Sequence, residues 1–252
     1  MVDINTFLDL AKKAAEEAAV KILEIYNSDD FDVSLKDDQS PLTKADKASH
    51  KVICEILEPL GLPVLSEEGK AISYAERSDW PYFWMVDPID GTKEFIKRNG
   101  EFTVNIALIK KDQPVLGVVQ VPATGDIYHA VWSMGAFKNG EKIQVSNKDI
   151  SSVGLKVVAS RSHLNEDTEA FMGSLKDPEI VSKGSSLKLL MVAEGEADIY
   201  PRFAPTMEWD TAAAQIIVEE AGGKVLQKNT NQSVVYNKED LLNPHFLVKG
   251  TR

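Results

Sequence analysis

The spacing of apolar residues changes along the chain from a helical period to a strand period, and this change most limits the folds open to it. In residues 1–30 apolar side chains recur every three or four positions, which predicts an amphipathic helix. Residues 44–57 repeat that pattern and are followed by Pro59 and Gly61, which predicts a second helix. Between them, residues 31–36 alternate as a short strand does.

From residue 82 the apolar period is two. Alternating or continuous apolar runs predict successive strands of an antiparallel sheet at residues 82–86, 102–108, 115–121, 128–132 and 136–138. Asn139-Gly140 is typical of a tight hairpin turn. Beyond residue 151 the two patterns alternate, with strands expected at 155–159 and 224–226 and helices at 167–175, 186–194 and 211–221.

These patterns predict an α+β protein in two parts. We expect an α+β domain over residues 1–150, with an antiparallel sheet and most of the candidate ligands, and a smaller α/β domain over residues 151–252. A cleft between the two parts is the default place for a functional site.

Composition excludes several classes of protein. The chain has 252 residues, of which 43% are hydrophobic, so it can bury a core, and no run reaches the roughly 18 to 20 apolar residues of a membrane span. The net charge of −11 argues against binding a nucleic-acid polymer but leaves open a small phosphorylated substrate in a local cationic pocket. The start of the chain lacks a secretory pattern and Cys54 is the single cysteine, so we expect a cytoplasmic protein. Monomer and homodimer, and peripheral association with the inner membrane, stay open.

Three acidic stretches are expected in loops at the ends of elements, at residues 66–69, 87–92 and 208–211. Asp87 and Asp90 follow an apolar run, and Pro88 and Gly91 force a turn that can direct both carboxylates into one small volume. Such a pair is repulsive without a cation. Clustered oxygen ligands are what Mg²⁺ prefers, so a magnesium site is one interpretation.

Taken singly, each acidic stretch also has an ordinary interpretation. Glu67 and Glu68 are typical of a solvated loop, Asp210 of a helix cap, and Asp87 and Asp90 of a turn. The spacing does not fit an EF-hand loop, nor the D-x-D-x-T motif of aspartyl-phosphate phosphatases, because Asp87 and Asp90 are three positions apart. The combined pattern favours a metal site.

The acidic motifs resemble a known family. Residues 84–92 (WMVDPIDGT) and 209–213 (WDTAA) resemble the two signatures of the inositol monophosphatase superfamily, and Glu67 lies 20 residues before Asp87, as that family's Glu-Glu element does. Residues 93–103, 184–188 and 200–203 are similar to the 3'(2'),5'-bisphosphate nucleotidases within the superfamily, whereas inositol phosphatases usually continue differently after Asp-Gly-Thr. The resemblance implies a layered α-β-α-β-α sandwich of the inositol monophosphatase and sugar phosphatase type.

The resemblance also implies a metal centre and a mechanism. One Mg²⁺ would bind Glu67, Asp87 and the carbonyl of Ile89, and a second would bind Asp87, Asp90 and Asp210. Two or three ions are expected, Mn²⁺ as a substitute and Li⁺ as an inhibitor. A metal-activated water would attack in line, with Thr92 orienting it and Asp46 accepting the Thr92 hydroxyl proton. Asp46 is also open to interpretation as an ordinary acid in the first turn of a helix.

The implied reaction is hydrolysis of the 3'-phosphate of 3'-phosphoadenosine 5'-phosphate to AMP and phosphate, with the sulfate-donor form of sulfur metabolism as a second substrate. The residues expected to contact substrate are Glu67, Asp90, Gly91, Thr92, Ser160, His163, Gly184, Ser185, Ser186, Lys188, Arg202 and Asp210, with Arg161 as a further candidate. Lone Lys and Arg residues are often only surface charges. An inositol or sugar phosphatase, and a non-catalytic nucleotide or metal sensor, stay open as alternatives.

Overall fold

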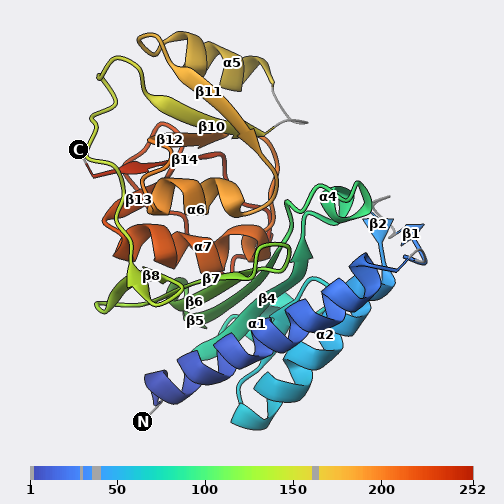
Figure 1. Cartoon of the computed structure of the whole chain (residues 1–252). Coiled ribbons are helices and arrows are strands. Elements are labelled where there is room, and N and C mark those ends of the chain that lie inside the picture. Colours follow the sequence, from blue (N-terminus) through green and yellow to red (C-terminus); the bar gives the residue numbers. More distant parts are fainter. Residues whose placement is uncertain (1–2, 29–30, 36–40, 161–164, 252) are drawn as a thin grey trace.

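The computed structural model describes residues 3–28, 31–35, 41–160 and 165–251. They form five layers: helices α1 and α2, a seven-stranded sheet, helices α6 and α7, a five-stranded sheet, and helix α5 (Figure 1). The layered α+β fold is therefore confirmed. No helix in the described part of the chain is long and apolar enough to cross a membrane.

The helices of the described residues fall into two groups: the five longer ones begin and end close to the positions expected from the sequence, and the three short ones at residues 58–60, 74–77 and 92–96 were not predicted. The helices are α1 (Ile4–Tyr26), α2 (Lys44–Leu57), the 3-10 helix η1 (Glu58–Leu60), α3 (Tyr74–Arg77), α4 (Thr92–Ile96), α5 (Glu166–Gly173), α6 (Leu187–Ala193) and α7 (Glu208–Glu220). The bounds of α2 are those predicted. Helix α7 begins three residues before the predicted start, because the acidic stretch that leads into it is already helical.

The first sheet has the strand order β3-β4-β5-β6-β7-β8-β9. Its strands are β3 (Val64–Ser66), β4 (Tyr82–Asp90), β5 (Thr103–Lys110), β6 (Gln113–Val121), β7 (Asp126–Val131), β8 (Gly135–Lys138) and β9 (Glu141–Lys142). From β4 to β9 every neighbour is antiparallel, as predicted, and β3 adds in parallel to β4. The predicted hairpin at Asn139-Gly140 is present, with φ angles of 51° and 84° that such a turn requires.

The second sheet has the strand order β11-β10-β12-β14-β13. Its strands are β10 (Lys156–Ser160), β11 (Glu179–Lys183), β12 (Ile199–Arg202), β13 (Gly223–Gln227) and β14 (Phe246–Gly250). The sequence predicted β10 and β13 and missed the other three. The strand expected at 31–36 is only the two-residue β1 (Ser34–Leu35), which pairs with β2 (Pro41–Leu42).

The first sheet is buried on both faces. Its outer face packs on an alanine-rich stripe of α1 and on α2, and its inner face packs on α7 (Figure 1). Contact with α7 is close at Gly117 of β6, where an added Cβ would lie 2.3 Å from the carbonyl oxygen of Ala213. The core on this face includes residues from both sheets. The chain passes from one sheet to the other between residues 142 and 156, but the two parts share a core.

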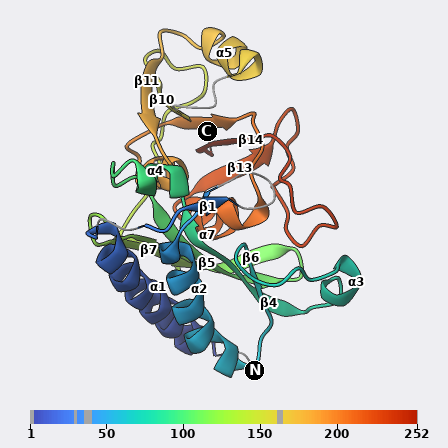
Figure 2. The same cartoon turned by 90° about the vertical axis from the view of Figure 1, so that its right-hand side faces the viewer.

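The short helix α4 lies at the end of β4, beside β1 and β2 and between the levels of the two large sheets (Figures 1 and 2). At this end of β4 the N–H of Ser186, from the second part of the chain, donates to Asp90, so segments from both parts of the chain meet here.

Candidate active site

Two neighbouring aspartates, Asp87 and Asp90, meet the distant Asp210 at the end of β4. One carboxylate oxygen from each of Asp87, Asp90 and Asp210 lies within 4.8 Å of the others. Asp87 and Asp90 flank a bulge, where Pro88 and Ile89 are inserted between the residues that pair with β5. The bulge bends the strand so that its two aspartates reach the same small volume.

Asp210 enters from the first turn of α7. One of its oxygens accepts the backbone N–H of Met207 at 2.9 Å, so Asp210 does cap the helix, as the ordinary interpretation predicted. The same carboxylate also belongs to the aspartate cluster. A capping role and a place in the cluster are therefore compatible.

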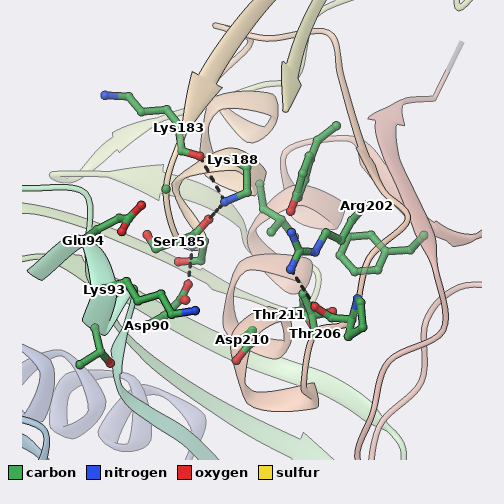
Figure 3. Close-up of a pocket in the computed structure, with 18 of the residues that line it drawn as sticks. Asp90, Lys93, Glu94, Lys183, Ser185, Lys188, Arg202, Thr206, Asp210 and Thr211 are labelled. Carbon is green, nitrogen blue, oxygen red and sulfur yellow. Dashed lines mark hydrogen bonds between the residues drawn. The ribbon is translucent and has the colours of Figure 1, made fainter. Parts of the chain in front are cut away.

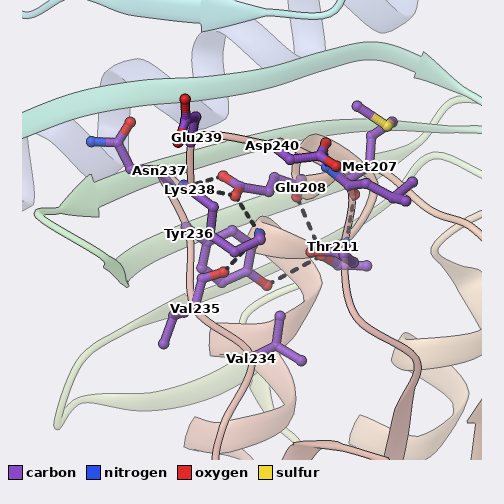
Figure 4. Close-up of polar contacts among 12 residues, drawn as sticks. Met207, Glu208, Thr211, Val234, Val235, Tyr236, Asn237, Lys238, Glu239 and Asp240 are labelled. Carbon is purple, nitrogen blue, oxygen red and sulfur yellow. Dashed lines mark hydrogen bonds and ion pairs between the residues drawn. The ribbon is translucent and has the colours of Figure 1, made fainter. Parts of the chain in front are cut away.

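The first turn of α7 is held in place by the buried side chain of Glu208 (Figure 4). Its carboxylate accepts the backbone N–H groups of Asn237 at 2.6 Å and Lys238 at 3.0 Å and also binds the Lys238 ammonium. Tyr236 donates its hydroxyl to Gln215 one turn further along. This network fixes the end of the helix from which Asp210 projects.

The aspartates repel one another. Burial, then the negative charges of Glu67, Asp90 and Asp210, hold the pKa of Asp87 well above its ordinary value. Burial and the charge of Asp90 do the same to the pKa of Asp210. Glu67 lies outside the group of three but lines the same pocket. The principal influences on Asp87 thus all raise its pKa, and the hard oxygen donors of the site fit divalent cations.

The pKa of Asp90 is raised less strongly. Burial raises it, while Lys188, the backbone N–H of Ser186, Arg202 and Asn105 lower it. Ser186 donates that N–H directly to Asp90. Asp90 therefore lies next to the cations of the pocket, Lys188 and Arg202.

Thr92 and Asp46 are in contact, as the resemblance implied. Thr92 Oγ1 lies 3.2 Å from Asp46 Oδ1 and 3.3 Å from the carbonyl oxygen of Ile89. The other oxygen of Asp46 accepts both the N–H and the hydroxyl of Thr43, at 2.8 and 2.6 Å. Asp46 therefore caps α2 and holds Thr92 at the same time.

The segment before α6 forms the opposite wall of the pocket (Figure 3). Lys188 is buried, and its ammonium donates to the carbonyls of Ser185 at 2.6 Å and Lys183 at 3.4 Å. Burial, more than any neighbouring charge, lowers its pKa to about 8. An ammonium has three donors, so one remains for an anion in the pocket.

Arg202 adds a second cation to this wall. It donates from Nη2 to the carbonyl of Pro205 at 2.7 Å, and its buried Nε has no hydrogen-bond partner among the described residues. The cavity between the walls measures about 390 Å³. A cavity of that size suits a nucleotide-sized ligand.

Two glycines allow the walls to approach. At Gly91, with φ of 93°, an added Cβ would lie 3.0 Å from the carbonyl oxygen of Glu101 and 3.2 Å from Ser185 Cβ. At Gly184 it would lie 2.8 Å from Glu94 Cγ. The Gly184 N–H also donates to Glu101 at 2.8 Å, so this loop is attached to the first part of the chain.

The structure brings together most of the residues expected at the site. The pocket is lined by Glu67, Asp90, Gly91, Thr92, Gly184, Ser185, Ser186, Lys188, Arg202 and Asp210. Asp46, Asp87 and Ile89 lie directly behind this lining. Ser160 ends β10, and Arg161 and His163 lie outside the described residues, so their expected substrate contacts stay predictions.

Ser186 differs from expectation in its contacts. Its hydroxyl donates to Asn105 Oδ1 at 3.0 Å and accepts from Thr103 at 2.7 Å, and its N–H is used by Asp90. Its polar groups are thus engaged within the protein, although it lines the pocket. Sequence reasoning gave Thr103 and Asn105 no role. The only signal was that both are polar on a strand whose two faces are otherwise apolar.

Lys93 and Lys183 were also missed as residues of this pocket. Lys93 directly follows Thr92, and its exposed side chain extends past Asp90 in Figure 3. Its position next to the Asp-Gly-Thr motif was the available signal.

Comparisons with known proteins agree with this arrangement. A model described as the inositol monophosphatase family matches residues 3–250. The 3'(2'),5'-bisphosphate nucleotidase CysQ of Salmonella typhimurium is 42% identical over 246 residues, which cover 96% of this chain and 98% of that protein. CysQ of Haemophilus influenzae is 34% identical over 236 residues, covering 91% and 88%.

Solved structures show the same likeness. The crystal structure of CysQ from Bacteroides thetaiotaomicron matches with a TM-score of 0.86 and 45% identity, covering 98% of both chains. The inositol monophosphatase from Anabaena (Nostoc) sp. PCC 7120 matches with a TM-score of 0.79 and 27% identity, covering 99% of this chain and 93% of that one.

Proposed function

Because this chain belongs to the inositol monophosphatase family, we propose that it is a magnesium-dependent 3'(2'),5'-bisphosphate nucleotidase. Its substrate is 3'-phosphoadenosine 5'-phosphate and its products are AMP and phosphate. The sulfate-donor form of that nucleotide is a second substrate. The observation that carries the proposal is the convergence of Asp87, Asp90 and Asp210 beside Thr92, in a pocket whose other wall is cationic. The identity to curated nucleotidases supports this choice of substrate.

The residues present suit the divalent cations that the family implies. Glu67, Asp87 and the Ile89 carbonyl would hold one ion, and Asp87, Asp90 and Asp210 a second. When bound, such ions neutralise the phosphate and stabilise the charge that develops during its transfer. The raised pKa values of Asp87 and Asp210 support this assignment, since a bound cation would relieve the mutual repulsion of these buried carboxylates, which Arg202 offsets only in part at Asp210.

Thr92 and Asp46 position a water next to the phosphate. When the Thr92 hydroxyl donates its proton to Asp46, its oxygen is left able to accept a proton from a water in the pocket. Asp46 is held by its two contacts with Thr43, so an acceptor for the Thr92 proton is in place before substrate binds. Pre-set orientation of this kind removes part of the entropic barrier of the reaction.

Lys188 and Arg202 recognise the second phosphate. Both line the pocket, and both keep donors that the described residues do not use. Lys188 remains a cation at neutral pH because its pKa of about 8 still lies above 7. The two cations would also offset part of the repulsion between the anionic nucleotide and the aspartates.

Phosphate release from a panel of phosphoesters tests the proposal. We expect release from 3'-phosphoadenosine 5'-phosphate with Mg²⁺, none after chelation, and inhibition by Li⁺. Faster release from inositol monophosphate would identify an inositol phosphatase instead. Tight nucleotide binding without release would identify a sensor. A cytoplasmic location is part of the proposal and is tested by cell fractionation.

A further inference from the structure

One face of α2 contacts the two segments that hold the implied metal ligands. Ser49 and His50 lie three and four residues after Asp46, so all three share that face. The fully buried Ser49 donates its hydroxyl to the carbonyl of Pro88 at 2.8 Å. His50 Nδ1 lies 2.9 Å from Ser66 Oγ, in the residue before Glu67.

The Ser49 contact falls on the bulge that directs the aspartates. Pro88 has no N–H, and Ile89 donates its own N–H to Asp87 Oδ1 at 3.0 Å. Neither residue is paired with β5 in the sheet. The Ser49 hydroxyl therefore anchors, from another element, a part of β4 that lacks the usual support of a sheet.

The His50 contact supports the neighbouring segment in the same way. Ser66 ends β3, which pairs with β4, and the Glu67 N–H donates to the carbonyl of Val86 at 3.1 Å. His50 thus fixes the position from which Glu67 projects. Ser49 therefore supports the segment that follows Asp87, and its neighbour His50 supports the segment that precedes Glu67.

We propose that Ser49 is a positioning residue of the divalent-metal site, and that His50 gives the segment before Glu67 the same support. The inference rests on the proposed function for the identity of the ligands. Without the Ser49 hydroxyl the Pro88 carbonyl is buried and unpartnered, and the bulge is free to move. The aspartates would then sample positions that bind a cation less well.

The test is direct titration of the metal-free protein with Mn²⁺ in a calorimeter. Groups that orient metal ligands through hydrogen bonds typically affect metal affinity by 10- to 100-fold, so Ser49→Ala should weaken Mn²⁺ binding about tenfold or more. The control is Thr168→Val in α5, which removes a buried hydroxyl bonded to Asn165 at 2.7 Å, away from the pocket. Thr168→Val should leave Mn²⁺ affinity unchanged.

Equal Mn²⁺ affinity for Ser49→Ala and the parent protein would overturn the role of Ser49, even if the variant melts earlier. Should Ser49→Ala fail to fold, His50→Ala, at a partly exposed position, decides the matter by the same titration. Unchanged affinity in His50→Ala then counts against the inference. At saturating Mg²⁺ the folded variants should recover most of the parent's kcat, because the ligands themselves are intact.

The two proposals fail separately. If the parent releases no phosphate from the nucleotide, the proposed function is wrong, but the Mn²⁺ titration still decides whether Ser49 and His50 position a metal site. If phosphate is released and Ser49→Ala binds Mn²⁺ normally, only the inference about α2 is wrong.

Discussion

Replacing Asp87 by asparagine should stabilise the metal-free protein while it abolishes activity. Asp87 is 1% exposed and lies within 4.8 Å of two other carboxylates. Two like charges at that distance repel by roughly 3 kcal/mol at an effective dielectric constant of about 20. Part of this repulsion is relieved by protonation, so we expect Asp87→Asn to raise the free energy of unfolding by about 1 to 3 kcal/mol at pH 7.5.

The substitution keeps the local hydrogen bond. Asp87 Oδ1 accepts the Ile89 N–H at 3.0 Å, and an amide oxygen can accept it equally well. The matched control is Asp198→Asn. Asp198 is also buried, but hydrogen bonds from Ser146, Lys156 and Lys148 lower its pKa despite burial. Asp198→Asn should therefore destabilise the protein.

The assay is urea denaturation in EDTA over a range of pH. The pKa of Asp87 is higher in the folded protein than in the unfolded chain, so its protonated carboxyl favours folding. This contribution to stability is complete below the ordinary pKa near 3.8 and is lost as the pH rises through the pKa of the folded state. Metal-free Asp87→Asn should thus lose less stability than the parent as pH rises. With Mg²⁺ present the parent should be more stable than Asp87→Asn, because only the parent gains free energy from binding the ion. A metal-free Asp87→Asn less stable than the parent would refute this account of the site.

Three further results are expected. Thr92→Val should lower kcat by about 100-fold or more, the usual contribution of such proton-transfer partners, and leave Mn²⁺ affinity in a calorimeter unchanged. Lys188→Met should raise KM for the bisphosphate about tenfold, which is the loss of one charge-assisted hydrogen bond, while Lys97→Met, just after α4 and outside the pocket lining, should not. Burial raises the pKa of Glu219 to about 7, so its carboxylate destabilises the folded protein above that pH. In urea denaturation Glu219→Gln should therefore stabilise the protein by about 2 to 3 kcal/mol at pH 8 and have no effect near pH 4. Equal stability of Glu219→Gln and parent at pH 8 would contradict the last of these.

Local patterns were enough to predict the elements that begin and end on strong signals. Helix α2 has a threonine cap, and Pro59 and Gly61 lie just beyond it, so both ends could be predicted. The hairpin at Asn139-Gly140 follows from the need for positive φ at both residues. The turn after Asp87 could be expected because Pro88 restricts the backbone and Gly91 tolerates a positive φ, whereas the ligand roles of Asp87 and Asp90 were implied only by the resemblance to a family.

Contacts between distant segments could not be predicted in this way. The places of strands β11, β12 and β14 in the second sheet depend on pairing between residues that are distant in the sequence. Ser186 looked like a donor to substrate because it precedes a helix. Its hydroxyl is used instead by Thr103 and Asn105, more than 80 positions away. Such contacts depend on how the two sheets are packed, which residue spacing does not encode.

The position of the site explains how the fold tolerates so much repulsive charge. The aspartates project from the end of β4 and the start of α7, the strand and helix that the shared core holds together. The backbone of Asp210 cannot move away from Asp87 without displacing a helix that leaves no room for a Cβ at Gly117. The repulsion therefore does not push the aspartates apart, and a bound cation would relieve it. A protein that bound its ions only through flexible loops would relax the same repulsion by moving the ligands apart, and would then bind metal more weakly.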